Sequence, residues 1–185
     1  MMKRFYFLFI ISIALLNVSA LRSGSQLSTN QYIDRYRDIA LFNQQEYGIP
    51  ASITLAQGIH ESASGTSKMA RKANNHFGIK CIGWSGSSYY TGSGKRRGGC
   101  YRAYDIAEDS FCDHARILKS QSRYAFLFKL DITDYKAWAK GLKKAGYAGD
   151  PKYPAKLIKV IEDYNLNQIV LDAIADTLPK MDLSL

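Results

Sequence analysis

The feature that most constrains the fold is a change of pattern in the middle of the chain. On both sides of residues 74–102, apolar residues recur every three or four positions, which is the spacing of amphipathic helices. Within that segment the spacing is lost, glycine becomes frequent and tyrosines occur in pairs. The pattern predicts an α+β fold, mainly α, in which a small β-hairpin lobe interrupts a helical lobe.

Two cysteines bracket the interrupting segment. We expect short strands at 87–91 and 99–103, joined by a turn rich in Gly, Lys and Arg. Cys81 and Cys100 flank this hairpin, so we predict that they form a disulfide, and the odd cysteine count leaves Cys112 as a small residue on a helix. The cysteines and histidines show no zinc-ligand spacing, so we expect no metal and no cofactor.

The helices are predicted from apolar stripes and from end signals such as glycine, proline and capping residues. An Asp followed three residues later by a Glu has the spacing of a capping box. We expect helices at 31–47, from Pro50 through Glu61, at 67–73, from an Asp105/Glu108 capping box through Leu118, from Thr133 or Asp134 to just before Gly146, and from Asp150 and Pro151 through Tyr164.

The first twenty residues differ in composition from the rest. Lys3 and Arg4 precede an apolar run at 5–18, and Val-Ser-Ala at 18–20 is a small-residue cleavage pattern. This order is typical of a secretory signal peptide, and the run is short for a membrane span; an uncleaved N-terminal anchor is the alternative. We expect a secreted or periplasmic protein with a signal peptide at 1–20, a linker at 21–30, one domain at 31–166 and an amphipathic C-terminal tail at 167–185.

Charge limits the class of partner. The formal net charge is +9, of which Lys3 and Arg4 supply two. A basic exported domain suggests an anionic partner, which leaves cell wall, membrane surface or nucleic acid. The chain has no polybasic amphipathic helix, and this counts against the last two. We therefore expect a monomer that neither binds nucleic acid nor stays inserted in a membrane after signal cleavage.

One carboxylate is placed unusually, at the end of an expected helix. After Glu61 there is no Asp or Glu until residue 105, although Lys and Arg recur through the same stretch. The helix C-terminus and the apolar neighbours Ile59 and Ala63 would raise the pKa of this carboxyl, whereas nearby cations would lower it. A carboxylic acid that stays protonated near neutral pH suits general-acid cleavage of glycosides. A surface glutamate at a frayed helix end is the alternative.

Three short motifs resemble one enzyme family. Residues 56–62, Ala-Gln-Gly-Ile-His-Glu-Ser, resemble the catalytic segment of the endo-β-N-acetylglucosaminidases of glycoside hydrolase family 73, the flagellar and autolysin-type peptidoglycan hydrolases. Residues 74–80 and 145–153 resemble the family's Asn-Asn-x-Phe-Gly-Ile-Lys and Gly-Tyr-Ala-x-Asp-Pro-x-Tyr blocks. The resemblance implies a lysozyme-like fold and cleavage of β-1,4 bonds between N-acetylglucosamine and N-acetylmuramic acid, with peptidoglycan glycan strands as the partner.

The resemblance also implies roles for single residues. Glu61 falls on the general acid of the family. Asn75, Phe77 and Tyr147 fall on positions that line or support the sugar cleft. To these we add Tyr90, an aromatic residue of the expected hairpin, as a candidate for stacking on a sugar face.

The sequence departs from the family in the β lobe. Many members carry a second carboxylate before the strand that here contains Cys100, where this chain has Gly-Ser-Gly-Lys-Arg-Arg-Gly-Gly. The missing role could pass to the N-acetyl group of the substrate, to Asp150 through water, or to Glu108 or Asp105. We interpret these three acids as helix caps and expect substrate assistance. A lytic transglycosylase that uses Glu61 alone and a non-catalytic peptidoglycan-binding module are the alternative functions.

Overall fold

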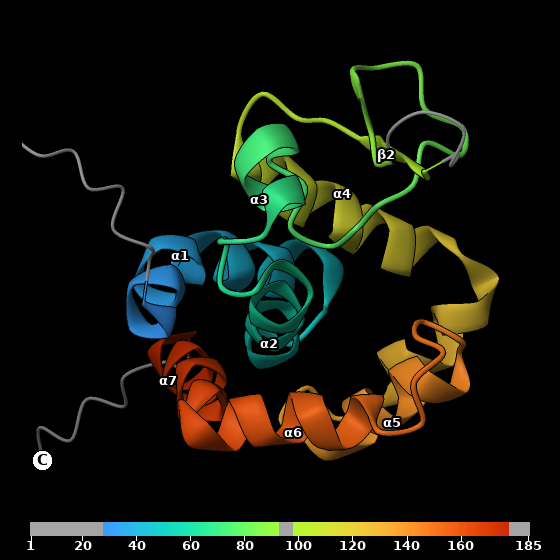
Figure 1. Ribbon diagram of the computed structural model, residues 1–185. Helices are drawn as coiled ribbons and strands as arrows, with labels where there is room; N and C mark the ends of the chain where they lie inside the picture. The colour runs from blue at the N-terminus through green and yellow to red at the C-terminus, as the bar shows by residue number, and fades with distance from the viewer. Residues whose placement is uncertain (1–27, 93–97, 178–185) are drawn as a thin grey trace, which may run out of the picture.

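The structure, a computed structural model, describes residues 28–92 and 98–177 (Figure 1). The expected signal peptide at 1–20, the linker as far as residue 27 and the centre of the hairpin turn at 93–97 lie outside the described residues. The end of the C-terminal tail, from residue 178, also lies outside them. No helix in 28–92 or 98–177 is long and apolar enough to cross a membrane.

The described chain is mainly helical, with one two-stranded antiparallel sheet, and this confirms the predicted fold class. The elements in chain order are α1 (Thr29–Tyr47), α2 (Ala51–Ser62), α3 (Lys68–Ala73), β1 (Ser88–Tyr90), β2 (Cys100–Arg102), α4 (Ala107–Ser120), the 3-10 helix η1 (Ser122–Lys129), α5 (Tyr135–Lys144), α6 (Tyr153–Asp163) and α7 (Leu166–Thr177).

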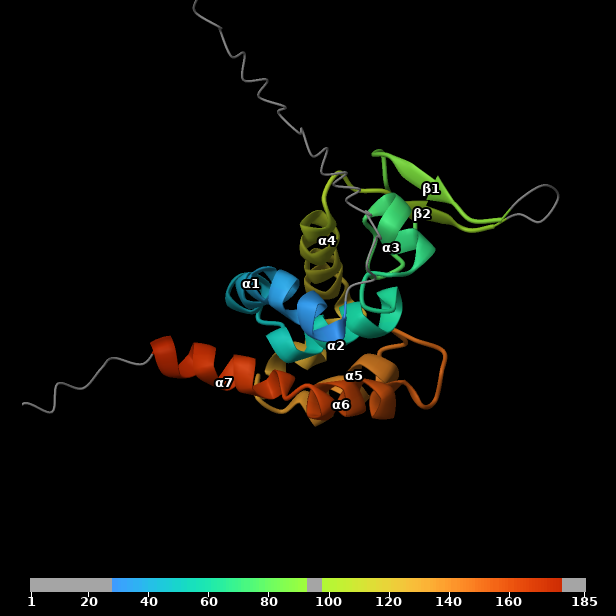
Figure 2. The same cartoon turned by 60° about the vertical axis from the view of Figure 1, so that its left-hand side comes forward.

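Helix α2 lies in the middle of the helical lobe (Figures 1 and 2). It contacts α1, α5, α6 and α7, and all of its residues are buried except His60 and Glu61 near its C-terminal end. A helix without a polar face fits such a central position because its backbone polar groups are satisfied within the helix. Gly58 allows α1 to come close: a Cβ atom at this position would lie 2.5 Å from the hydroxyl oxygen of Tyr32.

The ends of α1 and α5 lie close to the predicted positions, although α1 begins at Thr29, inside the segment expected to be a linker. Ser28 caps α1 in a full capping box with Gln31, and Gly48 ends α1 in the left-handed conformation, with φ of 74°. The carboxylate of Asp134 accepts a hydrogen bond of 2.9 Å from the backbone N–H of Ala137 at the start of α5. These caps explain why α1 and α5 begin and end close to the predicted positions.

Two predicted caps are wrong. Helix α4 begins after Ile106 without a side-chain cap, because the backbone carbonyl of Asp105 accepts a hydrogen bond from Asn74 and belongs to the preceding loop. The start of α6 also differs from the prediction. The carboxylate of Asp150 accepts from the backbone N–H of Lys152 and pairs with Lys156, so Asp150 closes the turn before α6 and is not its N-cap.

The β lobe has few buried side chains and is held by specific bonds. Strand β1 pairs with β2 in the antiparallel register that places Ser88 opposite Arg102. Cys81 and Cys100 form the predicted disulfide, and Cys112 on α4 is free. The strands are shorter than predicted by one residue at each end, and their side chains are exposed or half-buried. A disulfide compensates for a small core because it restricts the unfolded chain.

Two further segments complete the helical lobe. The short 3-10 helix η1 follows α4 and was not predicted, although its residues Tyr124 and Leu127 are buried. Part of the predicted C-terminal tail forms α7, which buries Leu166 and Val170 and contacts α2. The helical core therefore extends beyond residue 166, where we expected the domain to end.

Candidate active site

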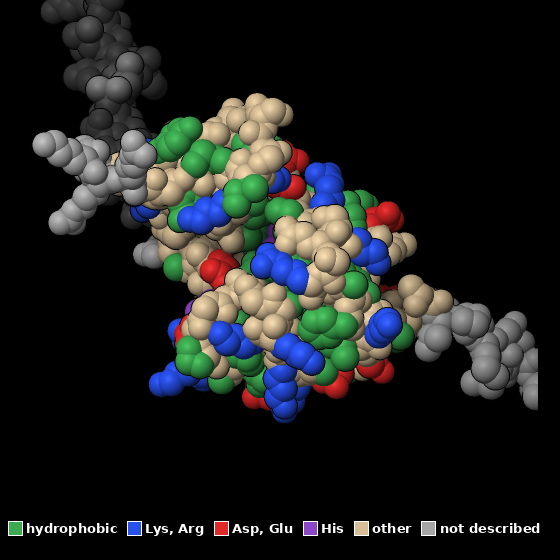
Figure 3. Space-filling model, turned by 90° about the vertical axis from the view of Figure 1, so that its right-hand side faces the viewer, with side chains coloured by type: hydrophobic (Ala, Val, Ile, Leu, Met, Phe, Trp, Pro, Cys, Tyr) green, Lys and Arg blue, Asp and Glu red, His purple; other side chains and the backbone are tan. Residues whose placement is uncertain are grey.

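A cleft of about 770 Å³ lies where the helical lobe meets the β lobe. Its walls come from the end of α2, the loop before β1, β2, α4, η1 and the loop after α5. In the space-filling view the surface is hollowed between an upper and a lower part (Figure 3). The lining residues include Glu61, Phe77, Ile79, Lys80, Ile82, Tyr101, Arg102, His114, Arg123, Tyr124 and Tyr147.

Glu61 reaches this cleft because the chain turns sharply just after it. The residues Ala63, Ser64 and Gly65 have positive φ angles of 52°, 53° and 76°, so α2 cannot continue. The hydroxyl of Ser62 stabilises the turn by accepting a hydrogen bond of 2.7 Å from the backbone N–H of Gly65. Because α2 ends at Ser62, no further helical turn covers the carboxyl of Glu61, and it stays exposed to the cleft.

The surroundings of Glu61 favour its protonated form. Partial removal from water by the cleft wall raises the pKa of its carboxyl above the ordinary value. A hydrogen bond from the Tyr153 hydroxyl and the charges of His60 and Lys156 act in the opposite direction without cancelling this rise. A carboxylic acid with a raised pKa retains its proton to higher pH, as a general acid requires.

Two polar side chains lie close to this carboxyl. Gln57, one helical turn before Glu61, donates from Nε2 to the hydroxyl of Tyr153 over 3.0 Å. The hydroxyl of Tyr153 lies near enough to Glu61 to lower the pKa of its carboxyl, and its ring stacks on that of Tyr147, with ring centres 5.7 Å apart. We did not predict Tyr153 or Gln57 as site residues. The spacing of four between Gln57 and Glu61 was the available signal, since it places both on one helix face.

Phe77 and His114 form another part of the wall. Their rings stack with centres 4.1 Å apart, and the rings of His114 and Tyr147 meet in a T-shaped arrangement with centres 5.8 Å apart. His114 is buried, and neither of its ring nitrogens has a hydrogen-bond partner. Burial lowers the pKa of this imidazole to about 3, so it is neutral at neutral pH. Phe77 and His114 both line the cleft. A contact between Phe77 and a sugar stays a prediction, and we did not predict His114 as a site residue.

Comparison with known proteins decides the family. The family model described as glucosaminidase, or mannosyl-glycoprotein endo-β-N-acetylglucosaminidase, matches residues 37–166. The chain belongs to the glucosaminidase family. The predicted resemblance to the glycoside hydrolases of family 73 is thereby confirmed.

Individual relatives of this glucosaminidase domain agree with that assignment. The exo-glucosaminidase LytG of Bacillus subtilis is 31% identical over 83% of this chain and 57% of its own length. The autolysin of Enterococcus faecalis is 36% identical over 64% of this chain and 18% of its own length. This chain therefore spans less than two thirds of these curated relatives.

Solved structures share the fold over their whole length. A peptidoglycan hydrolase from Sphingomonas sp. A1 is 30% identical and has a TM-score of 0.66, over 83% of this chain and 99% of that one. The glycoside hydrolase domain of FlgJ from Salmonella typhimurium is 25% identical and has a TM-score of 0.65, over 82% of this chain and 100% of that one. The lysozyme-like fold that the resemblance implied is thus confirmed.

Two other predicted site residues of the glucosaminidase domain do not line this cleft. Asn75 is buried, and its amide donates to the carbonyls of Ile79 and Arg102 while accepting from the backbone N–H of Ile79. Asn75 therefore stabilises the loop before β1 that lines the cleft, but does not line the cleft itself. Tyr90 is 70% exposed on β1 and lines a smaller adjacent hollow that also includes Lys68. A sugar contact by Tyr90 stays a prediction.

The described lining of the cleft contains more cationic than anionic side chains. Among the lining residues that the structure describes, Glu61 is the only carboxylate, whereas Lys80, Arg102 and Arg123 are cationic. The turn at 93–97 lies outside the described residues, and its sequence contains no Asp or Glu. The second carboxylate that many glucosaminidases carry in the β lobe thus has no counterpart among the described cleft residues.

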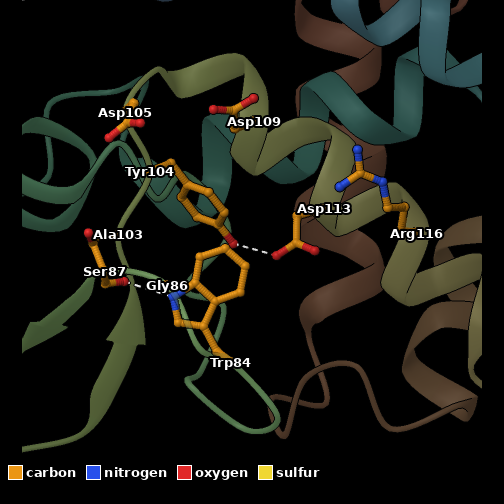
Figure 4. Close-up of a pocket in the computed structure, with 9 residues that line it drawn as sticks. All are labelled: Trp84, Gly86, Ser87, Ala103, Tyr104, Asp105, Asp109, Asp113 and Arg116. Atoms are coloured by element: carbon orange, nitrogen blue, oxygen red, sulfur yellow. Dashed lines mark hydrogen bonds between the residues drawn. The ribbon is translucent and has the colours of Figure 1, made fainter.

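The acids nearest in sequence to β2 face a different hollow. A separate space of about 330 Å³ is lined by Asp105, Asp109 and Asp113 together with Trp84 and Tyr104 (Figure 4). Asp113 accepts a hydrogen bond of 2.6 Å from Tyr104 and pairs at 2.8 Å with Arg102, which lines the Glu61 cleft. The Arg102–Asp113 pair therefore belongs to the wall between the two hollows.

Proposed function

We propose that this chain is a peptidoglycan hydrolase that cleaves β-1,4 glycosidic bonds next to N-acetylglucosamine, with Glu61 as the general acid. One observation carries the proposal. Glu61 is the single carboxylate among the described lining residues of the cleft, and burial raises its pKa. Family membership and the similarity to solved peptidoglycan hydrolases support the substrate class.

The first step uses the proton of Glu61. As the bond between the anomeric carbon and the bridging oxygen breaks, Glu61 donates its proton to that oxygen, which leaves as a hydroxyl. Tyr153, which accepts a hydrogen bond from Gln57, lies beside this carboxyl, and we assign to it the role of orienting the acid. Tyr147 is half-buried beside Glu61, and burial raises the pKa of its hydroxyl well above the ordinary value. The Tyr147 side chain therefore stays neutral, and we assign its ring a place against the sugar.

The opposite face of the sugar needs a nucleophile, and we assign this role to the N-acetyl oxygen of the substrate. Attack of that oxygen on the anomeric carbon gives a cyclic oxazolinium ion, which water then opens while Glu61 takes up a proton from the water. None of the three alternative acids is among the described lining residues of the cleft: Asp150 pairs with Lys156, Asp105 lines the second hollow, and Glu108 lies on α4. Inhibition by a thiazoline analogue of the cyclic intermediate would support this step.

A second candidate is a lytic transglycosylase, which the single acid of the cleft also favours. Such an enzyme uses one carboxyl to protonate the leaving oxygen and then lets a hydroxyl of the sugar close a 1,6-anhydro ring. Mass spectrometry of the muropeptides released from purified sacculi separates the two reactions, because the anhydro product is lighter by one water. A hydrolase gives reducing N-acetylglucosamine ends, and absence of any product would support a binding module instead.

We further propose that the domain acts outside the cytoplasm as a monomer. The expected signal peptide at 1–20, the basic charge of +9 and a wall substrate support this location. Cell fractionation with an antibody against residues 28–177 tests it. The expected result is a band in the medium or periplasm whose mass lacks the first twenty residues, and a band confined to the cytoplasm would contradict the proposal.

A further inference from the structure

Two of the three cations that line the cleft have no carboxylate partner in the described part of the chain. Arg102 is fully engaged, because it pairs with Asp113 and donates to the backbone carbonyls of Lys80 and Ile82. Lys80 and Arg123 take part in none of the ion pairs formed by residues 28–92 and 98–177. Their charges are therefore available to a ligand in the cleft.

Both side chains are held in place by neighbours that also line the cleft. The ammonium of Lys80 lies 3.7 Å from the ring centre of Tyr101, and the guanidinium carbon of Arg123 lies 4.6 Å from the ring centre of Tyr124. Arg123 also donates from Nε to the side-chain oxygen of Gln121 over 2.9 Å. Cation–π packing fixes a long side chain and reduces the entropy that binding would otherwise remove.

The two cations stand on different walls. Lys80 belongs to the loop that joins the β lobe through a bridge to Tyr101, and Arg123 lies at the start of η1 in the helical lobe. Lys and Arg side chains border both sides of the hollow in the space-filling view (Figure 3). A ligand that crosses the cleft next to Glu61 would thus meet positive charge on both sides, which favours an anionic ligand.

We propose that Lys80 and Arg123 bind carboxylates of the peptide stems on the muramic acid residues, and so make the site selective for glycan strands that carry acidic stems. This inference rests on the proposed function. The sugar hydroxyls and acetamido groups are neutral and need no cation, whereas a stem carboxylate forms charge-assisted hydrogen bonds with an ammonium or guanidinium group. The lactyl carboxylate that is exposed when a stem is removed has the same chemistry and is the other source.

The test compares three forms of one purified glycan. The first carries its stems, with the stem amines acetylated. The second is identical except that its carboxyl groups have been converted to methylamides. The third has lost its stems to an amidase and keeps only the lactyl carboxylates. We expect kcat/KM to be highest for the first form, and we expect salt between about 50 and 300 mM to raise KM for that form far more than for the second.

The variants Lys80→Gln and Arg123→Gln then measure each contribution. Each should lower the ratio of kcat/KM for the acidic form to that for the amidated form by about three- to tenfold, mainly through KM. Lys140→Gln is the matched control, because Lys140 is exposed on α5 and does not line the cleft. It should leave the ratio unchanged. Melting temperatures of all variants identify any loss that comes from unfolding.

The outcomes separate the two proposals. Equal kcat/KM for the acidic and amidated forms, with ratios unaltered in both variants, would overturn the role of Lys80 and Arg123 while leaving the hydrolase intact. A stem-free form that is cleaved as well as the acidic form, with the same loss in both variants, would reassign the cations to the lactyl carboxylate and overturn the stem. No cleavage of any form by the wild type would instead contradict the proposed function.

Discussion

The two walls of the cleft are built in different ways. The helical wall ends in α2, which is buried along nearly its whole length, and it presents Glu61 beside Tyr153, which accepts a hydrogen bond from Gln57. The β-lobe wall has strands without a buried side chain and is fastened by the Cys81–Cys100 disulfide and by the amide of Asn75. The first wall is held by packing, and the second by a few specific bonds.

The comparison explains why proton donation and contact with the polymer fall on different walls of the cleft. A proton donor must be held within a fraction of an ångström, and a close-packed helix supplies that rigidity. Contact with a long, varied polymer tolerates a looser surface, and the β lobe provides cationic and aromatic side chains on such a surface. The described β-lobe lining contains Lys80 and Arg102 but no acid, whereas the helical wall supplies Glu61 together with the cation Arg123.

The largest effect should come from the helical wall. Glu61→Gln keeps the shape of the side chain but removes its transferable proton, and we expect kcat to fall by roughly 10²–10⁴-fold. Turnover of purified sacculi measures the loss, and circular dichroism checks that the fold is intact. Glu46→Gln, on the exposed surface of α1, serves as the control. Near-wild-type turnover by Glu61→Gln would remove Glu61 from the mechanism.

The next effect should come from the β-lobe wall. Replacing both Cys81 and Cys100 by Ala should lower the free energy of unfolding by about 2–4 kcal/mol, because the unfolded chain gains freedom. We expect KM to rise more than kcat falls, since Glu61 remains on the other wall. Denaturant unfolding and sacculus kinetics measure the two effects, and Cys112→Ala is the control. Unchanged KM and stability would show that the Asn75 hydrogen bonds alone suffice to hold this wall.

Periodic features of the helical wall were predictable from the sequence. The apolar stripes and the Gly48 and Asp134 end signals placed α1 and α5, because these signals act within one helical turn, whereas the Ser28 cap lies in the segment that we expected to be a linker. The interruption at 74–102 predicted the hairpin, and its two flanking cysteines predicted the disulfide. Local chemistry determines these features, so a single sequence is enough to recognise them.

Contacts between distant segments were not predictable in the same way. The carboxylate spacing at 105 and 108 suggested a capping box, but Asn74 holds that backbone in a loop from a distance in sequence. The contact of Tyr153 with Gln57 and Glu61 joins α6 to α2, and η1 is a 3-10 helix that buries only Tyr124 and Leu127. Tertiary packing decides such features, so they follow from the fold and not from local pattern.

A smaller effect should distinguish close packing from simple burial in the helical wall. Gly58→Ala would place a methyl group 2.5 Å from the Tyr32 hydroxyl, and we expect a loss of about 1–3 kcal/mol in stability from overpacking. The hydroxyl of Ser52 on the same helix is buried without a partner, so Ser52→Ala should be neutral or stabilising. Urea unfolding measures both variants. Equal losses in the two would argue that α2 is merely buried and not closely packed against α1.

The smallest effect concerns the pH dependence of stability at Glu61. Because the folded state raises the pKa of this carboxyl, the folded protein binds the proton more tightly than the unfolded chain does. The stability that Glu61 contributes is therefore complete below its unfolded pKa, near the ordinary value of 4.5, and is lost as pH rises through the folded pKa. Glu61→Gln does not titrate and should melt slightly above the wild type at neutral pH.

The gain should disappear as pH falls toward 4.5, and this convergence is the measurement that decides the prediction. The buried His76 and His114 have lowered pKa values, of about 4 and about 3, so acid destabilises both proteins as they become charged. That loss is common to both proteins and cancels when melting temperatures are compared at each pH. Glu46→Gln supplies a baseline from an exposed carboxylate on α1. A difference between Glu61→Gln and the wild type that stays constant with pH would mean that the cleft does not favour the protonated carboxyl, and general-acid catalysis by Glu61 would then require the bound substrate to raise its pKa.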